Sequence, residues 1–236
     1  MRERPILFSA PMVRALLDGS KTQTRRIVKP QPPEDESIRA GFYHPTDVDR
    51  HGNAEPGDET FGAYTSDGEW AMKCTYGQPG DRLWVRESFN PWRFPGTGNV
   101  QIEYAADGAK EVRAVPSGKG YLLPDDDEVL VGNQNPPRFI RGKGRPSIHM
   151  PRWASRILLE IVSVRVERLN DISETDARAE GIEQDTDGWR DYLMPSTQSC
   201  TGPIGSYRTL WESINGAGAW DANPWVWHVE FRRVTP

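Results

Sequence analysis

The stretch SRILLEIVSVRVERL, residues 155–169, decides the fold of this chain. Aliphatic and β-branched residues dominate it, which favours an extended strand. It is longer than a typical strand of about five or six residues. We therefore expect either one long, bent strand or a pair of strands joined by a turn.

A short helix is expected directly after this stretch, in DISETDARAEGI, residues 171–182. Ser173 is followed three places later by an acidic residue, which is the capping-box pattern of a helix start. Gly181 is the expected stop. Glu180 falls near the C-terminal end of this helix, where the helix dipole disfavours a carboxylate unless a cation meets it.

The C-terminal region predicts one more helix and a final strand. The segment YRTLWESINGAGAW, residues 207–220, is typical of a helix closed by Gly216. In NPWVWHVEFRRV, residues 223–234, alternation places four apolar residues on one face of a strand. These are Trp225, Trp227, Val229 and Phe231, and we assign both tryptophans to the core.

The N-terminal region predicts a helix, a turn and a strand. SAPMVRALLD, residues 9–18, has apolar residues at helical spacing, Ser9 as N-cap and Gly19 at the C-terminal stop. TQTRRIV then predicts a strand with Thr24 and Arg26 on one face, which leaves Lys21 in the turn. GDRLWVRESF, residues 80–89, predicts another strand, with Trp84 and Arg86 on the face opposite Leu83 and Val85.

Two polar regions rich in Pro, Gly and Asp interrupt this pattern, at about residues 31–79 and 90–145. We expect a small hairpin at most in the first region. In the second we expect a strand at NVQIEYAAD, residues 99–107, and a solvated loop at the acidic run 125–128. The whole chain, residues 1–236, is expected to be one α+β domain built on a small mixed β-barrel with short helices.

Composition narrows the function classes. The net charge of −5 argues against a general nucleic-acid coat, which depends on many phosphate contacts, but it permits a local basic patch. Nine tryptophans indicate either a core built from large side chains or stacking surfaces for flat ligands. The two cysteines indicate neither a zinc site nor a disulfide framework. No long apolar run and no leader pattern occurs, so we expect a cytoplasmic, soluble protein.

Two groups of residues could carry chemistry in the folded chain. In GSKTQTRR, residues 19–26, Lys21 and Thr24 should lie close together across a turn, and a buried lysine with a lowered pKa can act as a base toward a hydroxyl. Alternatively, this segment is only a basic edge strand. Glu180 could be a surface carboxylate or the partner of a cation.

The segment RPSIHMPRWASR, residues 145–156, interleaves basic and aromatic side chains. Arg152, Trp153 and Arg156 have the chemistry needed to grip phosphates and stack on a base, as do Trp84 and Arg86. The alternative is ordinary structure. His149 stands alone, without another His or Cys nearby, so neither a metal site nor a cofactor is expected here.

The motifs LLDGSKTQTRR, GDRLWVRE, RILLEIVSV and ISETDARAEGI, taken together and in this order, resemble the ASCH domain, a relative of the PUA-like barrel. The segments SIHMPRWASRI and WDANPWVWHVEF resemble the longer ASCH proteins of tailed phages and prophages, whose compartment is the cytoplasm of the bacterial host. The likeness covers residues 1–30, 80–89 and 147–236.

The resemblance implies a function. ASCH relatives include small bacterial amidohydrolases that remove the acyl group from N4-acetylcytidine. Carried over by position, the resemblance implies Lys21 as base, Thr24 as nucleophile and Glu180 as charge partner or proton donor, with Arg26 holding an oxyanion or a phosphate. We expect a monomer whose partner is a nucleoside, a nucleotide or a single-stranded nucleic acid, and no membrane.

Two other functions stay open at this point. The same pocket could belong to a non-catalytic reader of RNA or of a modified base, in which Thr24 only donates a hydrogen bond. The chain could also be a structural or assembly protein of a phage.

Overall fold

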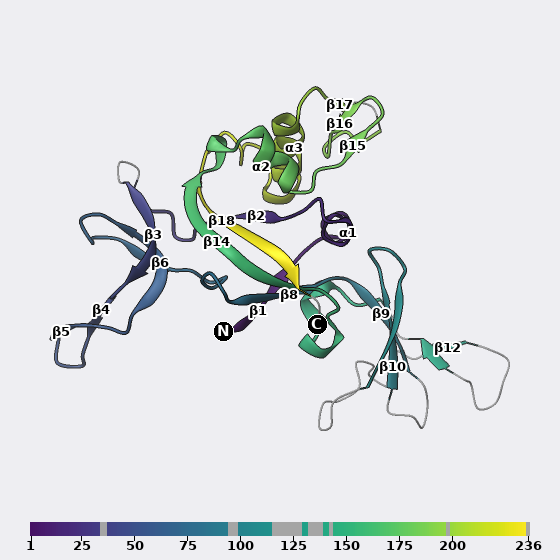
Figure 1. Ribbon diagram of the computed structural model, residues 1–236, viewed down its shortest axis with the longest axis horizontal. Helices are drawn as coiled ribbons and strands as arrows, with labels where there is room; N and C mark the ends of the chain where they lie inside the picture. The colour runs from purple at the N-terminus through teal and green to yellow at the C-terminus, as the bar shows by residue number, and fades with distance from the viewer. Residues whose placement is uncertain are drawn as a thin grey trace. The chain divides into compact units, whose positions relative to one another are not determined.

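A computed structural model describes residues 1–33, 37–93, 99–114, 129–131, 139–141, 144–196 and 199–234 of the chain. Strands dominate these residues, and three short α-helices accompany them (Figure 1). The expected α+β class with a mainly β skeleton is therefore confirmed.

The largest sheet has five strands in the order β1-β8-β14-β18-β2. The strands are β1 (Glu3–Leu7), β2 (Gln23–Ile27), β8 (Arg82–Arg86), β14 (Leu158–Arg168) and β18 (Trp225–Val234). The stretch SRILLEIVSVRVERL, residues 155–169, contains one long strand, β14, and not a strand pair. β1 and β2 are the edge strands, so the described residues form an open sheet and not the closed barrel that the sequence suggested.

All three helices end where the sequence predicts, and α1 and α2 also begin there. α1 (Ala10–Asp18) follows Ser9, and Gly19 after it has φ of 85°. α2 (Glu174–Ala179) is capped by the Ser173 side chain, which accepts a hydrogen bond from the Asp176 amide. α3 (Pro203–Asn215) begins earlier than expected and ends at Gly216, whose positive φ of 98° is accessible to glycine without strain. Three 3₁₀ turns complete the helical elements, at Ser147–His149, Arg152–Ala154 and Leu169–Asp171.

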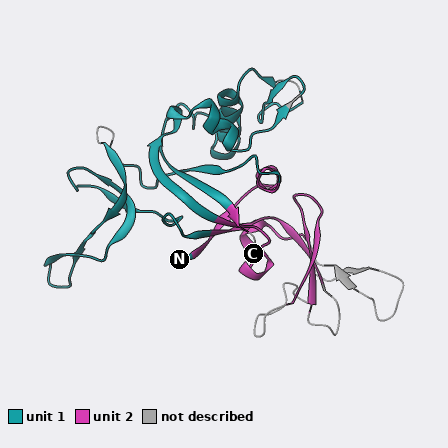
Figure 2. Cartoon of the chain, viewed as in Figure 1, with its two compact units in different colours: residues 1–2, 18–82, 160–232 teal, residues 3–17, 83–159, 233–236 magenta. Residues whose placement is uncertain are grey.

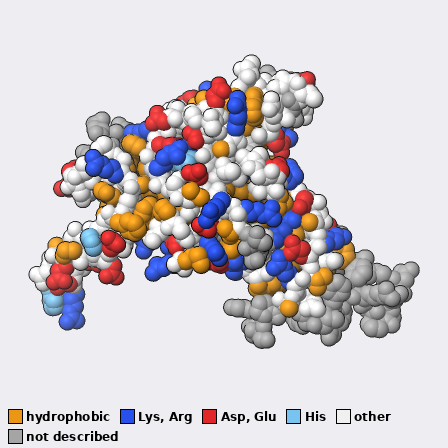
Figure 3. All heavy atoms as spheres, viewed as in Figure 1, with side chains coloured by type: hydrophobic (Ala, Val, Ile, Leu, Met, Phe, Trp, Pro, Cys, Tyr) orange, Lys and Arg blue, Asp and Glu red, His pale blue; other side chains and the backbone are white. Residues whose placement is uncertain are grey.

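The first polar region is more ordered than expected. It forms a three-stranded sheet of β3 (Ile38–Tyr43), β6 (Thr60–Thr65) and β7 (Ala71–Lys73), and a hairpin of β4 (Thr46–Val48) and β5 (Ala54–Pro56). The prediction of one small hairpin at most was wrong, because glycines inside these strands read as loop residues. Hydrophobic side chains gather on the visible surface over β3 and β6 (Figure 3).

The second polar region contains a further sheet in the order β11-β10-β9-β13-β12. Its strands are β9 (Phe89–Arg93), β10 (Asn99–Tyr104), β11 (Lys110–Ala114), β12 (Val129–Val131) and β13 (Phe139–Arg141). The expected strand NVQIEY is confirmed as β10. The acidic run 125–128 lies outside the described residues. A small sheet that the sequence did not predict consists of β15 (Gln184–Asp185), β16 (Gly188–Arg190) and β17 (Ser199–Cys200).

The described chain divides into two compact units (Figure 2). The first unit comprises Met1–Arg2, Asp18–Arg82 and Glu160–Arg232, and the second comprises Glu3–Leu17, Leu83–Leu159 and Arg233–Pro236. The chain passes from one unit to the other within β8, β14 and β18.

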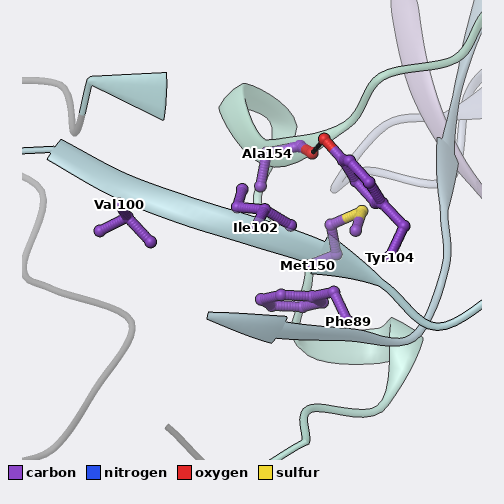
Figure 4. Packing of buried hydrophobic residues seen from close by; sticks show 6 residues of the cluster. All are labelled: Phe89, Val100, Ile102, Tyr104, Met150 and Ala154. Carbon is purple, nitrogen blue, oxygen red and sulfur yellow. Dashed lines mark hydrogen bonds between the residues drawn. The ribbon is translucent and has the colours of Figure 1, made fainter. Parts of the chain in front are cut away.

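The second unit contains a cluster of buried residues that comprises Phe89, Val100, Ile102, Tyr104, Met150 and Ala154 (Figure 4). The Tyr104 hydroxyl donates a hydrogen bond to the Ala154 carbonyl at 3.0 Å. This bond satisfies the polar end of a fully buried side chain.

β18 supplies core residues to the first unit. Trp227 and Phe231 are buried as expected, and Val226 and His228 on the alternate face are buried as well, so both faces of this strand are covered. Trp225 is only half-buried, and the Arg168 guanidinium lies 4.6 Å from the centre of its ring. The two tryptophans therefore differ in how much of their surface is removed from water.

Within the described residues, no helix is both long and apolar enough to cross a lipid bilayer.

We expect Trp227→Ala to lower the free energy of unfolding by about 3–5 kcal/mol, because it empties a fully enclosed site. Trp225→Ala should also lower the melting temperature, but by a smaller amount, because that ring is partly solvated already. Urea and thermal unfolding followed by circular dichroism measure both changes. Equal losses in the two variants would contradict the assignment of Trp227 as the more deeply buried ring.

Candidate functional site

Lys21 and Glu180 form the centre of the candidate site. Lys21 lies two residues before β2 and forms an isolated β-bridge with Glu180. Its Nζ donates to the Glu180 main-chain carbonyl at 2.7 Å and to Glu180 Oε2 at 2.9 Å. The Lys21 side chain is 0% exposed and the Glu180 side chain 3%. The turn after α1 is thus fixed to the C-terminal end of α2.

Glu180 is the C-cap residue of α2, where a carboxylate faces the negative end of the helix dipole. Two cations offset this: Lys21 binds Oε2, and Arg25 NH1 binds Oε1 at 3.1 Å. Of the two alternatives left open for Glu180, the structure shows the partner of a cation and not a surface carboxylate. The second cation, Arg25, was not among the site residues expected from the sequence.

Arg25 is the hub of a wider ion network. Its Nε donates to Glu167 Oε1 at 2.8 Å, and its NH2 lies 3.3 Å from Asp176 Oδ2. Arg165 pairs with the same two carboxylates, at 2.7 Å and 3.6 Å. Together with Lys21 and Glu180, the network contains three cations and three carboxylates, so its formal charges balance. Such balance is what makes charged groups tolerable in a buried position.

Gln23 connects this network to His228. Gln23 Nε2 donates to the Asp176 main-chain carbonyl at 2.8 Å, so its Oε1 faces His228 Nε2, also at 2.8 Å. An amide oxygen can only accept, so His228 must carry its proton on Nε2. Burial, with the positive charges of Arg25 and Arg165, lowers the pKa of His228 from 6.5 to about 4. This histidine is therefore neutral at pH 7.

Burial also shifts the pKa values of two groups at this site, Lys21 and Tyr207. Burial lowers the pKa of Lys21, and the Glu180 carboxylate opposes that effect without reversing it. The neighbouring charges of Arg26 and Arg25 lower the pKa further. Burial, together with Glu180, raises the pKa of the Tyr207 hydroxyl well above its usual value, so this group on α3 stays protonated. Because its pKa is lowered, Lys21 is a candidate proton acceptor.

Thr24 and Arg26 lie on the other face of β2. Thr24 is opposite Val229 and Arg26 is opposite Trp227 in the register of β2 with β18, and strand alternation separates both from the face of Gln23 and Arg25. Thr24 is 2% exposed and Arg26 is half-buried. The structure thus joins Lys21 to Glu180 directly and places the Thr24 side chain on the face opposite that of Arg25.

The period-two pattern of Lys21, Gln23 and Arg25 was the sequence signal for the network. Apart from Lys21, the site residues predicted in this segment were Thr24 and Arg26, which lie on the other face of the strand. Glu167 and Asp176 gave no separate signal, because acidic residues in a strand end and a helix first turn are ordinary on a protein surface.

Apart from Arg26, the arginines expected to grip phosphates belong to the second unit, and each has protein partners. Arg156 makes two hydrogen bonds to Glu87, at 2.9 and 3.0 Å, and pairs with Asp107 at 2.9 Å. Its guanidinium lies 4.0 Å from the centre of the Tyr104 ring. Burial raises the pKa of Glu87, although Arg156 opposes this, and burial raises the pKa of Tyr104 to about 12. Arg156 therefore stabilises the core of this unit through its contacts with Glu87, Asp107 and Tyr104.

The other basic and aromatic residues that were expected to bind a ligand also have partners within the protein. Arg152 pairs with Glu3 at 2.6 Å, and Arg86 donates to the main-chain carbonyls of Met150 and Ile148. Arg86 also lies 5.4 Å from the centre of the Trp84 ring, and Trp153 packs against the core cluster. A phosphate that binds here would have to compete with these partners.

A cavity of about 280 Å³ opens in the second unit. Its lining residues are Ser88, Phe89, Asn90, Ala105, Gly144, Arg145 and Pro146. None of the site residues expected from the sequence lines it. Within the described part of the chain, no group of three or more His, Cys, Asp or Glu side chains is placed to hold a metal ion.

Comparison with protein-family models, with curated proteins and with solved structures gives no match for this chain.

We expect Glu180→Ala to lower the free energy of unfolding by about 3–5 kcal/mol, because it leaves Lys21 and Arg25 buried with fewer partners. Glu174→Ala is the matched control, since Glu174 lies in the same helix and its pair with Arg178 is exposed. The control should lose about 1 kcal/mol at most. Urea unfolding measures both. A loss in Glu180→Ala no larger than in the control would contradict the structural role of the pair.

We expect stability to fall as pH drops from about 6.5 to about 4. The unfolded chain takes up a proton on His228 near pH 6.5, whereas the folded chain does so only near pH 4, so acid favours unfolding in this interval. The effect is at most roughly 3 kcal/mol. His228→Gln should flatten this slope, while His51→Gln, at an exposed position, should leave it unchanged. Urea unfolding at several pH values measures the slope, and equal slopes in both variants would contradict the prediction.

Proposed function

We propose that this protein is an ASCH-type, PUA-like protein that binds a nucleobase and hydrolyses an acyl amide on its exocyclic amine, as in N4-acetylcytidine. Lys21 is the base, Thr24 the nucleophile and Glu180 the group that holds Lys21 and returns a proton to the leaving amine. Arg26 faces the acyl oxygen or a phosphate of the substrate.

The observation that carries this proposal is the burial of Lys21 against Glu180. A lysine side chain with no exposed surface, a lowered pKa and a carboxylate 2.9 Å away supplies both a proton acceptor and the group that orients it. Arg25 holds the second oxygen of Glu180, which keeps the first oxygen directed at Lys21.

The proposed reaction uses water as its only co-reactant. The Thr24 hydroxyl gives its proton to neutral Lys21, and its Oγ1 forms a bond to the acyl carbon. The bond from that carbon to the base nitrogen then breaks, and the nitrogen takes the proton and leaves as the free amine. Water hydrolyses the acyl-threonine, which releases the carboxylic acid and restores Thr24.

A second candidate, a non-catalytic reader of a modified base or of RNA, is favoured by one feature of the site. Thr24 lies on the face of β2 opposite that of Arg25, and the Lys21 ammonium already has two acceptors on Glu180. In this candidate the ion network is a rigid frame, and Thr24 only donates a hydrogen bond to the ligand.

We expect the purified protein to release cytidine from N4-acetylcytidine, with most of the rate lost in Lys21→Met, Thr24→Val and Glu180→Gln. Val and Gln preserve the shapes of the residues they replace, and Thr24→Ser keeps the hydroxyl and should retain part of the rate. Chromatography of a panel of acylated nucleosides measures turnover. Circular dichroism confirms that each variant is folded.

The outcome of this panel separates the two candidates. Measurable binding without turnover of any acylated nucleoside favours the reader. Full activity in Thr24→Val would rule out Thr24 as the nucleophile while leaving Lys21 to be tested as a base toward water.

We expect the hydrolysis rate to rise with pH and to level off above the lowered pKa of Lys21, because only the neutral amine accepts a proton. A pH–rate profile under saturating substrate measures this. Arg25→Met removes a neighbouring positive charge, which lowers the pKa of Lys21 in the parent protein, so its profile should move to higher pH. A profile that falls with pH over this range contradicts the role of Lys21 as a base.

A further inference from the structure

The sheet of β3, β6 and β7 has an outward face that carries two tyrosines and two basic residues. Pairing and strand alternation place three residues of β3, three of β6 and two of β7 on this face. They are Arg39, Gly41, Tyr43, Thr60, Gly62, Tyr64, Ala71 and Lys73. The opposite face is covered on β6, where Ala63 and Thr65 are 0% and 1% exposed, while Phe42 on β3 is 51% exposed.

Two glycines stand side by side in the centre of the outward face, since Gly41 pairs with Gly62. A side-chain carbon on Gly62 would lie 2.2 Å from the main-chain carbonyl oxygen of Met72 on β7, so the close approach of these two strands requires glycine at this position. It would also lie 2.9 Å from Tyr43 Cε1, and a side-chain carbon on Gly41 would lie 3.4 Å from the Tyr64 hydroxyl oxygen. The two tyrosine rings thus lie across the glycines, with their centres 5.7 Å apart and their planes at 41°.

Tyr43 and Tyr64 remain partly exposed, so the face presents two aromatic rings to solvent. Exposed aromatic rings on a sheet stack with the bases of unpaired nucleic-acid strands, which offer a flat face whatever their sequence. A duplex hides these base faces. The geometry therefore suits single strands.

Two cations flank the rings. Arg39 lies directly opposite Tyr64 in the register, and Lys73 lies opposite Gly62 on the next strand. Both side chains are exposed, and among the described residues neither is paired with a carboxylate. The eight residues of the face include no carboxylate. The positive charge is thus available to the phosphates of a strand whose bases lie on the rings.

We propose that the outward face of the β3-β6-β7 sheet is a binding site for single-stranded nucleic acid, with bases stacked on Tyr43 and Tyr64 and phosphates contacted by Arg39 and Lys73. This site goes beyond the proposed amide hydrolysis, because it is formed by other residues and needs no catalysis. It gives the protein a means of holding a strand and not only a free nucleoside.

The test is fluorescence anisotropy with a labelled oligothymidylate, a matching oligouridylate and a duplex of mixed sequence. We expect both single strands to bind, with affinity falling as salt rises, and the duplex to bind more weakly. The ratio of the two single-strand affinities shows whether DNA or RNA is the preferred ligand.

Tyr43→Ala and Tyr64→Ala should each weaken single-strand binding by roughly 5- to 150-fold. Tyr43→Phe should bind like the parent protein, because stacking needs the ring and not the hydroxyl. Phe42→Ala is the matched control: Phe42 is 51% exposed on the same strand but lies on the opposite face, so binding should be unchanged. Arg39→Gln and Lys73→Gln should each reduce the slope of log affinity against log salt by about 1.

Three outcomes overturn the site: single strands that fail to bind, equal weakening in Phe42→Ala and Tyr64→Ala, or a salt slope unchanged in both charge variants. Should an alanine variant unfold, Tyr43→Phe, Arg39→Gln and Lys73→Gln still test the same surface. Turnover of free acylated nucleosides is measured separately, so the loss of strand binding and the loss of hydrolysis are distinguishable results.

Discussion

The buried ion pair between Lys21 and Glu180 joins two parts of the chain that are 159 residues apart in sequence. It fixes the start of β2 to the end of α2. Arg25, which lies two residues after Gln23 in β2, binds the other oxygen of the same carboxylate. Removing one member of such a pair leaves an uncompensated charge in a place without water. The positions of β2 and α2 within the first unit therefore depend on all three groups together.

The same network constrains the chemistry available to the protein. Because Glu180 uses one oxygen for Lys21 and the other for Arg25, it has little freedom to rotate, and Lys21 is kept dry and oriented. Preorganised charges in a dry site are useful in catalysis and equally useful in rigid recognition. Their arrangement is thus compatible with both candidate functions, and the placement of Thr24 is the feature on which the two differ.

Aromatic and cationic side chains are used in two ways in this protein. In the second unit, Arg156 lies over Tyr104 but is also bound to Glu87 and Asp107, so its charge is neutralised and serves the core. On the β3-β6-β7 sheet, Arg39 and Lys73 near Tyr43 and Tyr64 are paired with no carboxylate among the residues that the structure describes. The difference lies in the partners and not in the residue types, which is why a basic and aromatic segment such as residues 145–156 looked like a ligand site from its sequence.

The sequence by itself determined the elements whose signals are local: the cap of α2 at Ser173, its end at Gly181, the end of α3 at Gly216, and the strands β8, β14 and β18. It left Glu180 open between a surface carboxylate and the partner of a cation. Only the tertiary structure decided that β14 is a single strand, that the first polar region forms a sheet, and that Lys21, Gln23 and Arg25 face the acidic residues. Caps and periodicity depend on neighbours a few residues away, whereas the face a strand presents depends on its pairing partner, and a shift of one residue exchanges the two faces.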